Sequence, residues 1–313
     1  MVTPSADLPL AVGPAMTHKG GTQLIIATLI AAGRLGDSDL ARAVEIAGGG
    51  ELRWIDEGDA ADLLLGPVED WRDLRDGLEA GLPEIDVIVQ PVEGREKRLF
   101  VADMDSTMIG QECIDELADF AGKKAEIAAV TERAMQGDMD FAEALQARVA
   151  ELNGLGVACI ERCRTERVTH NQGARTVVQT MRARGAATLL VTGGFHDFAD
   201  PLASELGFAE VRANHLESMY GHLTGRVTGE IVDAAAKARA LTDRRDQLGL
   251  AVSDVLAVGD GANDAPMLTE AGLGISYRGK PKLEAIADAR LRYNDLTALL
   301  WAQGIARAEW VRG

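Results

Sequence analysis

Residues 101–110, VADMDSTMIG, place two carboxylates, Asp103 and Asp105, one residue apart at the end of a short apolar run. Side chains at positions i and i+2 of an extended segment point the same way, so both carboxylates would face one site. Their repulsion disfavours ionising both unless a cation compensates. A hard divalent cation such as Mg²⁺ prefers oxygen ligands of this kind. The pair therefore predicts a metal site at the end of a strand.

A second acidic cluster lies in LAVGDGANDAPML, residues 256–268. An apolar run there ends in a glycine-rich turn that carries Asp260 and Asp264, and Pro266 marks the first turn of a helix. In a parallel sheet this turn lies at the same edge as the first pair. We therefore expect Asp260 to complete the metal site, with Asp264 just outside the set of ligands.

A third strand end, LLVTGGFHDFA, supplies the hydroxyl of Thr192 and the backbone of Gly193 and Gly194. A hydroxyl beside exposed N–H groups near a helix start is suited to hold an anion. Each cluster alone has an ordinary interpretation, since Asp caps helices and T-G-G is common in turns. Their occurrence together, each after an apolar run, favours one site that binds a phosphate.

The elements that would position these residues are typical of a doubly wound α/β core. RLFVAD, ATLLVT and DVLAV are the short apolar runs expected of parallel strands buried on both faces. About seventy mostly helical residues separate the first run from the second, far more than a simple crossover needs. We interpret this segment, from about residue 113 to about residue 172, as a helical cap inserted over the ligand-binding edge of the sheet.

Residues 21–94 have a different pattern, which predicts the order β-α-β-β-α-β of a small ferredoxin-like α+β domain. Its first helix, at residues 38–47, is expected to have Ser38 or Asp37 as its N-cap. The polar stretch 93–97 is predicted to be the linker to the core, residues 95–313, and residues 1–20 a flexible tail. Fold alone does not assign this domain a role.

Charge and composition exclude several classes of partner. The formal charge of −17 comes from 49 acidic and 32 basic side chains, and it repels nucleic acid and anionic lipid surfaces. No apolar run approaches the ~20 residues that span a bilayer, and the first twenty residues lack the pattern of a secretory signal, so we expect a cytoplasmic protein. The three cysteines indicate neither disulfides nor a zinc site.

The motifs resemble those of the haloacid dehalogenase superfamily over roughly residues 98–295. DMDST matches D-x-D-x-T, Thr192 follows the second strand, Lys237 is the expected lysine, and GDGAND matches G-D-x-x-x-D. Within this superfamily the chain is similar to the phosphoserine phosphatases over DMDSTMIGQECIDELA, MQGDMDFAEALQARV, TGGF and GDGANDAPML. The first unit is weakly similar to small amino-acid-binding (ACT-like) domains, which leaves serine binding, homodimer formation or neither as its role.

The resemblance implies that Asp103 attacks phosphorus to form an aspartyl-phosphate, and that Asp105 first donates and then accepts a proton. It also implies that Mg²⁺ is held by the carboxylates of Asp103 and Asp260 and the backbone carbonyl of Asp105. Lys237 would neutralise the phosphoryl group together with the metal. A lysine in the helical run VDAAAKARALTDRR is ordinarily a surface residue, so Lys280 and Lys282 are alternatives.

Substrate specificity would come from the cap. The resemblance assigns Glu112 to a substrate ammonium and Arg148 to a substrate carboxylate, with Met135 and Phe141 as apolar walls. Asn263 would reach the phosphate or the polar end of the substrate. Without the resemblance, Glu112 is an ordinary acid of a first helical turn and Arg148 a surface charge.

The expected activity is Mg²⁺-dependent hydrolysis of O-phospho-L-serine, the last step of serine biosynthesis. One alternative is a phosphatase or phosphotransferase for another small phosphomonoester, such as homoserine phosphate. An alternative of another class is a non-catalytic sensor of phosphate or an amino acid.

Overall fold

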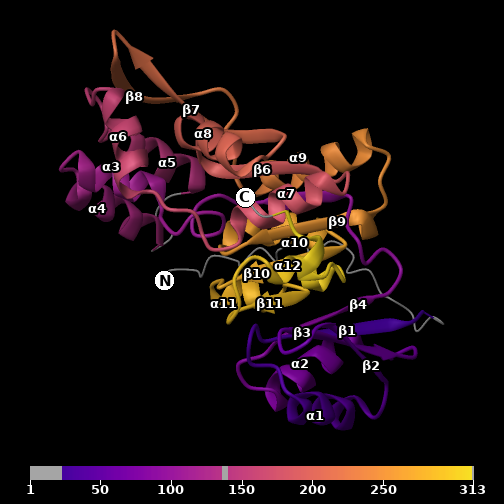
Figure 1. Ribbon diagram of the computed structural model, residues 1–313. Coiled ribbons are helices and arrows are strands. Elements are labelled where there is room, and N and C mark those ends of the chain that lie inside the picture. The colour runs from indigo at the N-terminus through magenta and orange to yellow at the C-terminus, as the bar shows by residue number, and fades with distance from the viewer. Residues whose placement is uncertain (1–22, 136–139, 312–313) are drawn as a thin grey trace, which may run out of the picture.

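The computed structural model describes residues 23–135 and 140–311, which two β-sheets organise (Figure 1). The tail expected at residues 1–20 and the side chain of Met135 lie outside what is described. None of the helices in these ranges combines the length and the apolar character that crossing a membrane requires.

The first sheet has four antiparallel strands in the order β2-β3-β1-β4. This is the predicted β-α-β-β-α-β unit, with both helices on one face of the sheet (Figure 1). Its elements are β1 (Ile25–Ile30), α1 (Asp37–Ala47), β2 (Glu51–Asp56), β3 (Ala60–Leu65), α2 (Trp71–Gly81) and β4 (Asp86–Pro91).

The N-cap predicted for helix α1 is wrong. Gly36 occupies that position, and its N–H donates to Asp39 Oδ2 at 2.9 Å. Asp37 and Ser38 already lie in the first helical turn, because the turn after β1 ends one residue earlier than the sequence indicated. A carboxylate at the third helical position thus caps the helix from within.

The second sheet has seven strands in the order β11-β10-β9-β5-β6-β7-β8, and only the pair β7–β8 is antiparallel. This confirms the doubly wound α/β core. Its strands are β5 (Leu99–Ala102), β6 (Ala187–Phe195), β7 (Glu210–Met219), β8 (His222–Thr228), β9 (Val255–Gly259), β10 (Leu273–Tyr277) and β11 (Ala289–Leu291). The helices after the cap are α7 (Ala174–Ala183), α8 (His196–Leu206), α9 (Ala234–Gln247), α10 (Ala265–Glu270), α11 (Pro281–Glu284) and α12 (Ala298–Ala302).

Strand β5 is the point at which the direction of winding reverses. It pairs with β6 on one side and with β9 on the other, and both neighbours are parallel to it. Chain connections leave such a point in opposite directions and open a crevice beyond the carboxyl ends of the strands. Asp103 follows β5 and Asp260 follows β9, so their placement at this crevice is a consequence of topology.

Four of the five helices that the structure describes between β5 and β6 gather at one end of the second sheet (Figure 1). They are α3 (Cys113–Phe120), α4 (Lys124–Met135), α5 (Phe141–Ala150) and α6 (Ala158–Arg167). The hairpin β7–β8 supports them from the side, because the Gly154 N–H donates to the Leu223 carbonyl and the Leu223 N–H to the Leu155 carbonyl, both at 2.8 Å. The sequence patterns did not predict this hairpin.

The two sheets are packed together through the open face of the first one. Ile30 and Ile88 of that face belong to the same apolar cluster as Trp301 of α12. The stretch 93–97, predicted as a linker, is part of this contact, since the Arg95 guanidinium lies 2.6 Å from the Asp62 carboxylate. The boundary between the domains remains a prediction.

Candidate active site

Lys237 lies among the aspartates at the carboxyl ends of strands β5 and β9 and is only 1% exposed. Its Nζ donates to Asp103 Oδ1 at 2.6 Å and to Asp264 Oδ1 at 2.7 Å. The lysine projects from the first turns of α9, where Asp233 caps the helix by accepting from the Ala236 N–H at 2.7 Å. The alternatives, Lys280 and Lys282, are exposed. The structure therefore brings Lys237, and neither alternative, into contact with the two aspartates.

Three carboxylates surround this ammonium. Oxygens of Asp103, Asp260 and Asp264 lie within 4.8 Å of one another, and all three side chains are buried. Asp264 Oδ2 accepts the N–H groups of Asp260 at 3.2 Å and Gly261 at 3.0 Å. Because Lys237 takes its other oxygen, Asp264 orients the turn, whereas Asp103 and Asp260 keep oxygens for a ligand.

The electrostatics of this cluster favour a cation. Burial raises the pKa of Asp103 well above its usual value, and the charge of Asp264 adds to this effect, while Lys237 opposes it. Burial, followed by the charge of Asp264, raises the pKa of Asp260 to about 6. One ammonium thus faces three buried carboxylates, and this excess of negative charge together with the oxygen donors fits a hard divalent metal ion.

Asp105 lies at the edge of the cluster and is partly buried. The Cys113 N–H donates to its Oδ1 at 3.3 Å. Its Oδ2 faces Gly194, where an added Cβ would come within 3.2 Å of that oxygen. Burial, and then the charge of Glu112, raise the pKa of Asp105 to about 7. A carboxyl with such a pKa can both donate and accept a proton near neutral pH.

The TGG segment forms the third side of the site. Thr192 is 1% exposed, and its Oγ1 accepts from the Gly194 N–H at 2.9 Å. In this structure the Gly194 N–H thus donates to the threonine hydroxyl, and the binding role of Thr192, Gly193 and Gly194 stays a prediction. Gly193 lies under the cap, since a Cβ there would be 3.0 Å from Phe141 Cζ.

The cap places the two predicted specificity residues near the acidic cluster. Glu112 is exposed, and its Oε1 accepts from Ser106 Oγ at 2.8 Å. Arg148 is partly buried on α5. Burial lowers the pKa of Arg148, and the charges of Asp115 and Glu112 oppose that effect. A guanidinium is thus held close to acids of the site.

Two further polar residues lie next to the aspartates of the acidic cluster. Asn263 is partly buried in the short 3₁₀ helix Ala262–Asp264, beside the acidic cluster. Thr107 was missed, although it is the threonine of the D-x-D-x-T motif, and its Oγ1 donates to Asp260 Oδ1 at 3.3 Å. Its place two residues after the second aspartate was the available signal.

The fold and the site define a doubly wound α/β protein with an inserted helical cap and a buried acidic site at the reversal of the sheet. The family model for haloacid dehalogenase-like hydrolases matches residues 100–269. The chain belongs to the haloacid dehalogenase-like hydrolase family.

Known proteins of this family are similar to the chain over long stretches. A phosphoserine phosphatase of Mycobacterium tuberculosis is 45% identical over 227 residues, which are 72% of this chain and 55% of that protein. The chain thus spans about half the length of this relative. A phosphoserine phosphatase of Streptococcus thermophilus is 44% identical over 64% of this chain and 93% of its own length. The solved structure of a probable phosphoserine phosphatase from Vibrio cholerae covers 95% of this chain and is itself covered to 90%, with a TM-score of 0.73 and 29% identity.

Proposed function

We propose that the chain is a Mg²⁺-dependent phosphatase that hydrolyses O-phospho-L-serine to L-serine and phosphate. The observation that carries the proposal is the buried Lys237 held between Asp103 and Asp264, next to Asp260. This arrangement leaves an excess of negative charge that a divalent metal ion would neutralise, and the metal together with Lys237 would attract the oxygens of a phosphoryl group. The names of the similar proteins support phosphoserine as the substrate.

In this proposal Asp103 attacks phosphorus, so that a bond forms between its carboxylate oxygen and phosphorus while the bond to the seryl oxygen breaks. Asp105 gives its proton to the departing seryl oxygen. Asp105 then takes a proton from a water molecule, which attacks phosphorus and releases phosphate from Asp103. The pKa of Asp105, about 7, suits a group that performs both transfers.

Lys237 keeps its charge in this buried place, because the charges of Asp103 and Asp264 raise its pKa more than burial lowers it. Its ammonium orients Asp103 and offsets negative charge on the transferring group. Asp103, Asp260 and the Asp105 carbonyl would hold Mg²⁺, with Asp264 supporting them from outside the ligand set. The metal would supply further neutralisation of the phosphoryl oxygens.

The substrate's amino-acid part would lie under the cap. We assign its carboxylate to Arg148 and its ammonium to Glu112, with Phe141 as an apolar wall beside Gly193. The roles given to Met135 and to Asn263 stay predictions. So do the place of the reaction in serine biosynthesis, a cytoplasmic location, and homodimer formation or serine binding by the first unit.

The proposal is tested by phosphate release from phosphoserine with and without Mg²⁺. We expect Asp103→Asn to abolish release, while the matched exposed aspartate variant Asp246→Asn keeps it. Arg148→Gln should raise KM for phosphoserine but leave KM for p-nitrophenyl phosphate unchanged. Equal effects on the two substrates would contradict the assignment of Arg148, and preference for homoserine phosphate would favour the alternative substrate. Binding of phosphoserine without any turnover would favour the sensor.

A further inference from the structure

The TGG segment interrupts the pairing of strands β6 and β7. Val191 pairs with Arg212 and Phe195 with Asn214, so β6 contains two more residues than β7 over this stretch. Such a bulge leaves backbone groups without their ladder partners. Unpaired backbone groups at a buried place cost free energy, so the fold must satisfy them in another way.

The side chain of Asn214 fills this gap. It is 1% exposed, its Nδ2 donates to the Gly193 carbonyl at 2.8 Å, and its Oδ1 accepts from the Val232 N–H at 2.9 Å. An amide side chain has one acceptor and a donor group, like a peptide unit. Asn214 thus joins two backbone segments that do not pair with each other directly.

Both segments lead to the acidic cluster. Gly193 lies between Thr192 and Gly194 in the TGG segment of β6, which faces Asp105 and the cap residue Phe141. Val232 directly precedes Asp233, the N-cap of α9, and the Lys237 N–H donates to the Asp233 carbonyl at 2.9 Å. The amide therefore fixes the distance between the TGG segment and the start of the helix that carries the buried ammonium.

We propose that Asn214 is a positioning residue for phosphoryl transfer, which holds the TGG segment and the start of helix α9 in a fixed position relative to each other. The inference rests on the proposed function. Misplacement of reacting groups by about 1 Å can cost on the order of 100-fold in rate. Loss of the bridge should therefore change catalysis beyond its effect on stability.

The test uses the full chain with Mg²⁺ and compares Asn214→Asp with the matched control Thr188→Val. Asn214→Asp preserves shape and the acceptor for Val232 but places a carboxylate oxygen against the Gly193 carbonyl. Thr188 is equally buried on β6, and its Oγ1 accepts from the Ala209 N–H at 3.0 Å. Its replacement removes one buried hydrogen bond outside the residues assigned to the site. Turnover of phosphoserine, inhibition by inorganic phosphate and thermal unfolding are measured for each variant.

We expect Asn214→Asp to lower kcat about 10- to 100-fold and to weaken inhibition by phosphate, while Thr188→Val keeps kcat within about 2-fold. The kcat of Asn214→Asp relative to the unchanged protein should rise as the pH falls from about 8 to about 5, because a protonated carboxyl can again donate to Gly193.

Wild-type kcat and phosphate inhibition in folded Asn214→Asp would overturn the inference, and so would the same loss of activity in Thr188→Val. If Asn214→Asp does not fold, Asn214→Ser is measured instead, and failure of both to fold would assign the residue to the fold alone. An unchanged protein without activity on any phosphomonoester would contradict the proposed function, which is a separate result.

Discussion

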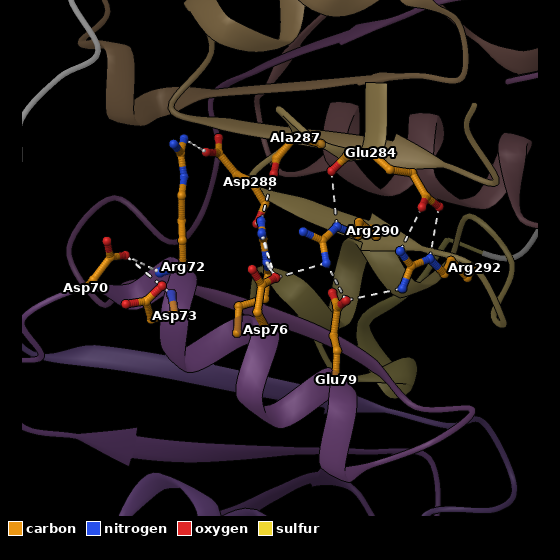
Figure 2. A network of polar contacts seen from close by, with 11 residues as sticks. Asp70, Arg72, Asp73, Asp76, Glu79, Glu284, Ala287, Asp288, Arg290 and Arg292 are labelled. Carbon is orange, nitrogen blue, oxygen red and sulfur yellow. Dashed lines mark hydrogen bonds and ion pairs between the residues drawn. The ribbon is translucent and has the colours of Figure 1, made fainter. Parts of the chain in front are cut away.

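The acidic site around Lys237 and the contact between helix α2 and residues 284–292 both bury charged side chains, but they differ in charge balance. At the site one ammonium faces three carboxylates. In the α2 contact, four arginines pair with four acids, and five of the six ion pairs form a continuous chain while Arg72–Asp288 stands apart (Figure 2): Arg72–Asp288, Arg75–Asp76, Arg290–Asp76, Arg290–Glu79, Arg292–Glu79 and Arg292–Glu284. The acidic site thus has an excess of negative charge, whereas positive and negative charges balance in the ion pairs of the α2 contact.

The pKa directions follow this difference. At the site burial and like charges raise the pKa values of Asp103 and Asp260. In the α2 contact the hydrogen bond and charge of Arg292 lower the pKa of Glu284. Asp288 is an exception there, because burial raises its pKa more than its hydrogen bonds to Gly274 and Arg72 lower it. The balanced ion pairs of the α2 contact hold two parts of the chain together. The excess of negative charge at the acidic site is suited to bind a metal cation, and the metal can in turn bind an anion.

The largest effect on stability and turnover is expected from a substitution that increases the excess of negative charge at the acidic site. Lys237→Met removes the ammonium that contacts both Asp103 and Asp264. Breaking a buried ion pair costs about 3–5 kcal/mol of unfolding free energy, and loss of this cation should lower kcat at least about 1,000-fold. Urea unfolding and phosphate release measure both effects. Lys282→Met, which changes an exposed lysine, is the control, and an equal effect in both variants would contradict this account.

A bound metal ion should offset the excess negative charge of the acidic site. It should therefore stabilise the protein through this site and not through the α2 contact. Mg²⁺ at about 100 times its Kd should raise the free energy of unfolding by about 2.7 kcal/mol. Thermal unfolding with and without Mg²⁺ measures the shift. Asp260→Asn should lose most of it, and Arg290→Met should retain it. A Mg²⁺ shift that survives in Asp260→Asn would mean that the ion binds elsewhere.

The balanced cluster should matter for stability and not for turnover. Arg290→Met removes ion pairs with Asp76 and Glu79 at 3.0 and 2.6 Å, and we expect a loss of about 1–3 kcal/mol with kcat unchanged. The matched control is Arg239→Met, whose pair with Glu230 is exposed, and its effect should stay below about 1 kcal/mol. Equal stability of the two variants by urea unfolding would show that the α2 contact contributes little.

The smallest effect, expressed per pH unit, is in the pH dependence of stability. Between about pH 4 and about 6, Asp260 is ionised in the unfolded chain and protonated in the metal-free folded one. The folded state then binds more protons, so its stability falls as pH rises through this window, by at most about 1.4 kcal/mol per pH unit. Glu284 acts in the opposite sense, because its pKa is lowered in the folded chain. Its contribution to the free energy of unfolding is lost only as the pH falls below the usual pKa of a glutamate.

Unfolding by urea at several pH values, with a chelator or with Mg²⁺, measures this slope. We expect the fall between about pH 4 and about 6 to disappear with Mg²⁺, because the metal favours the ionised carboxylates. The same slope under both conditions would contradict a metal at this site.

Local sequence predicted much of the site because topology does most of the positioning. Apolar runs that end in aspartates place Asp103 and Asp260 at one sheet edge, and the parallel order of the strands brings them together. The contact of Lys237 with the aspartates was indicated only by the order of motifs, since its helix has no apolar face that points to burial. The resemblance to a family therefore supplied what periodicity could not.

Contacts between distant parts of the chain were not predictable in this way. Arg75 lies in a polar helix, where the sequence indicates a surface position. In the structure it is only 3% exposed and donates to the carbonyls of Ala287 and Asp288. Asn214 lies in a strand with no recognisable motif. Both side chains bond to backbone groups whose positions depend on the complete fold, and such partners leave no local pattern.

The central claim is that the unbalanced site around Asp103 accepts a phosphoryl group. The most direct measurement mixes the protein with phosphoserine and Mg²⁺, quenches it in acid within one turnover, and locates any added phosphoryl mass by peptide mass spectrometry. We predict that the mass appears on the peptide that contains Asp103 and that hydroxylamine removes it. Turnover with no such label, or with the label on another residue, would contradict the account.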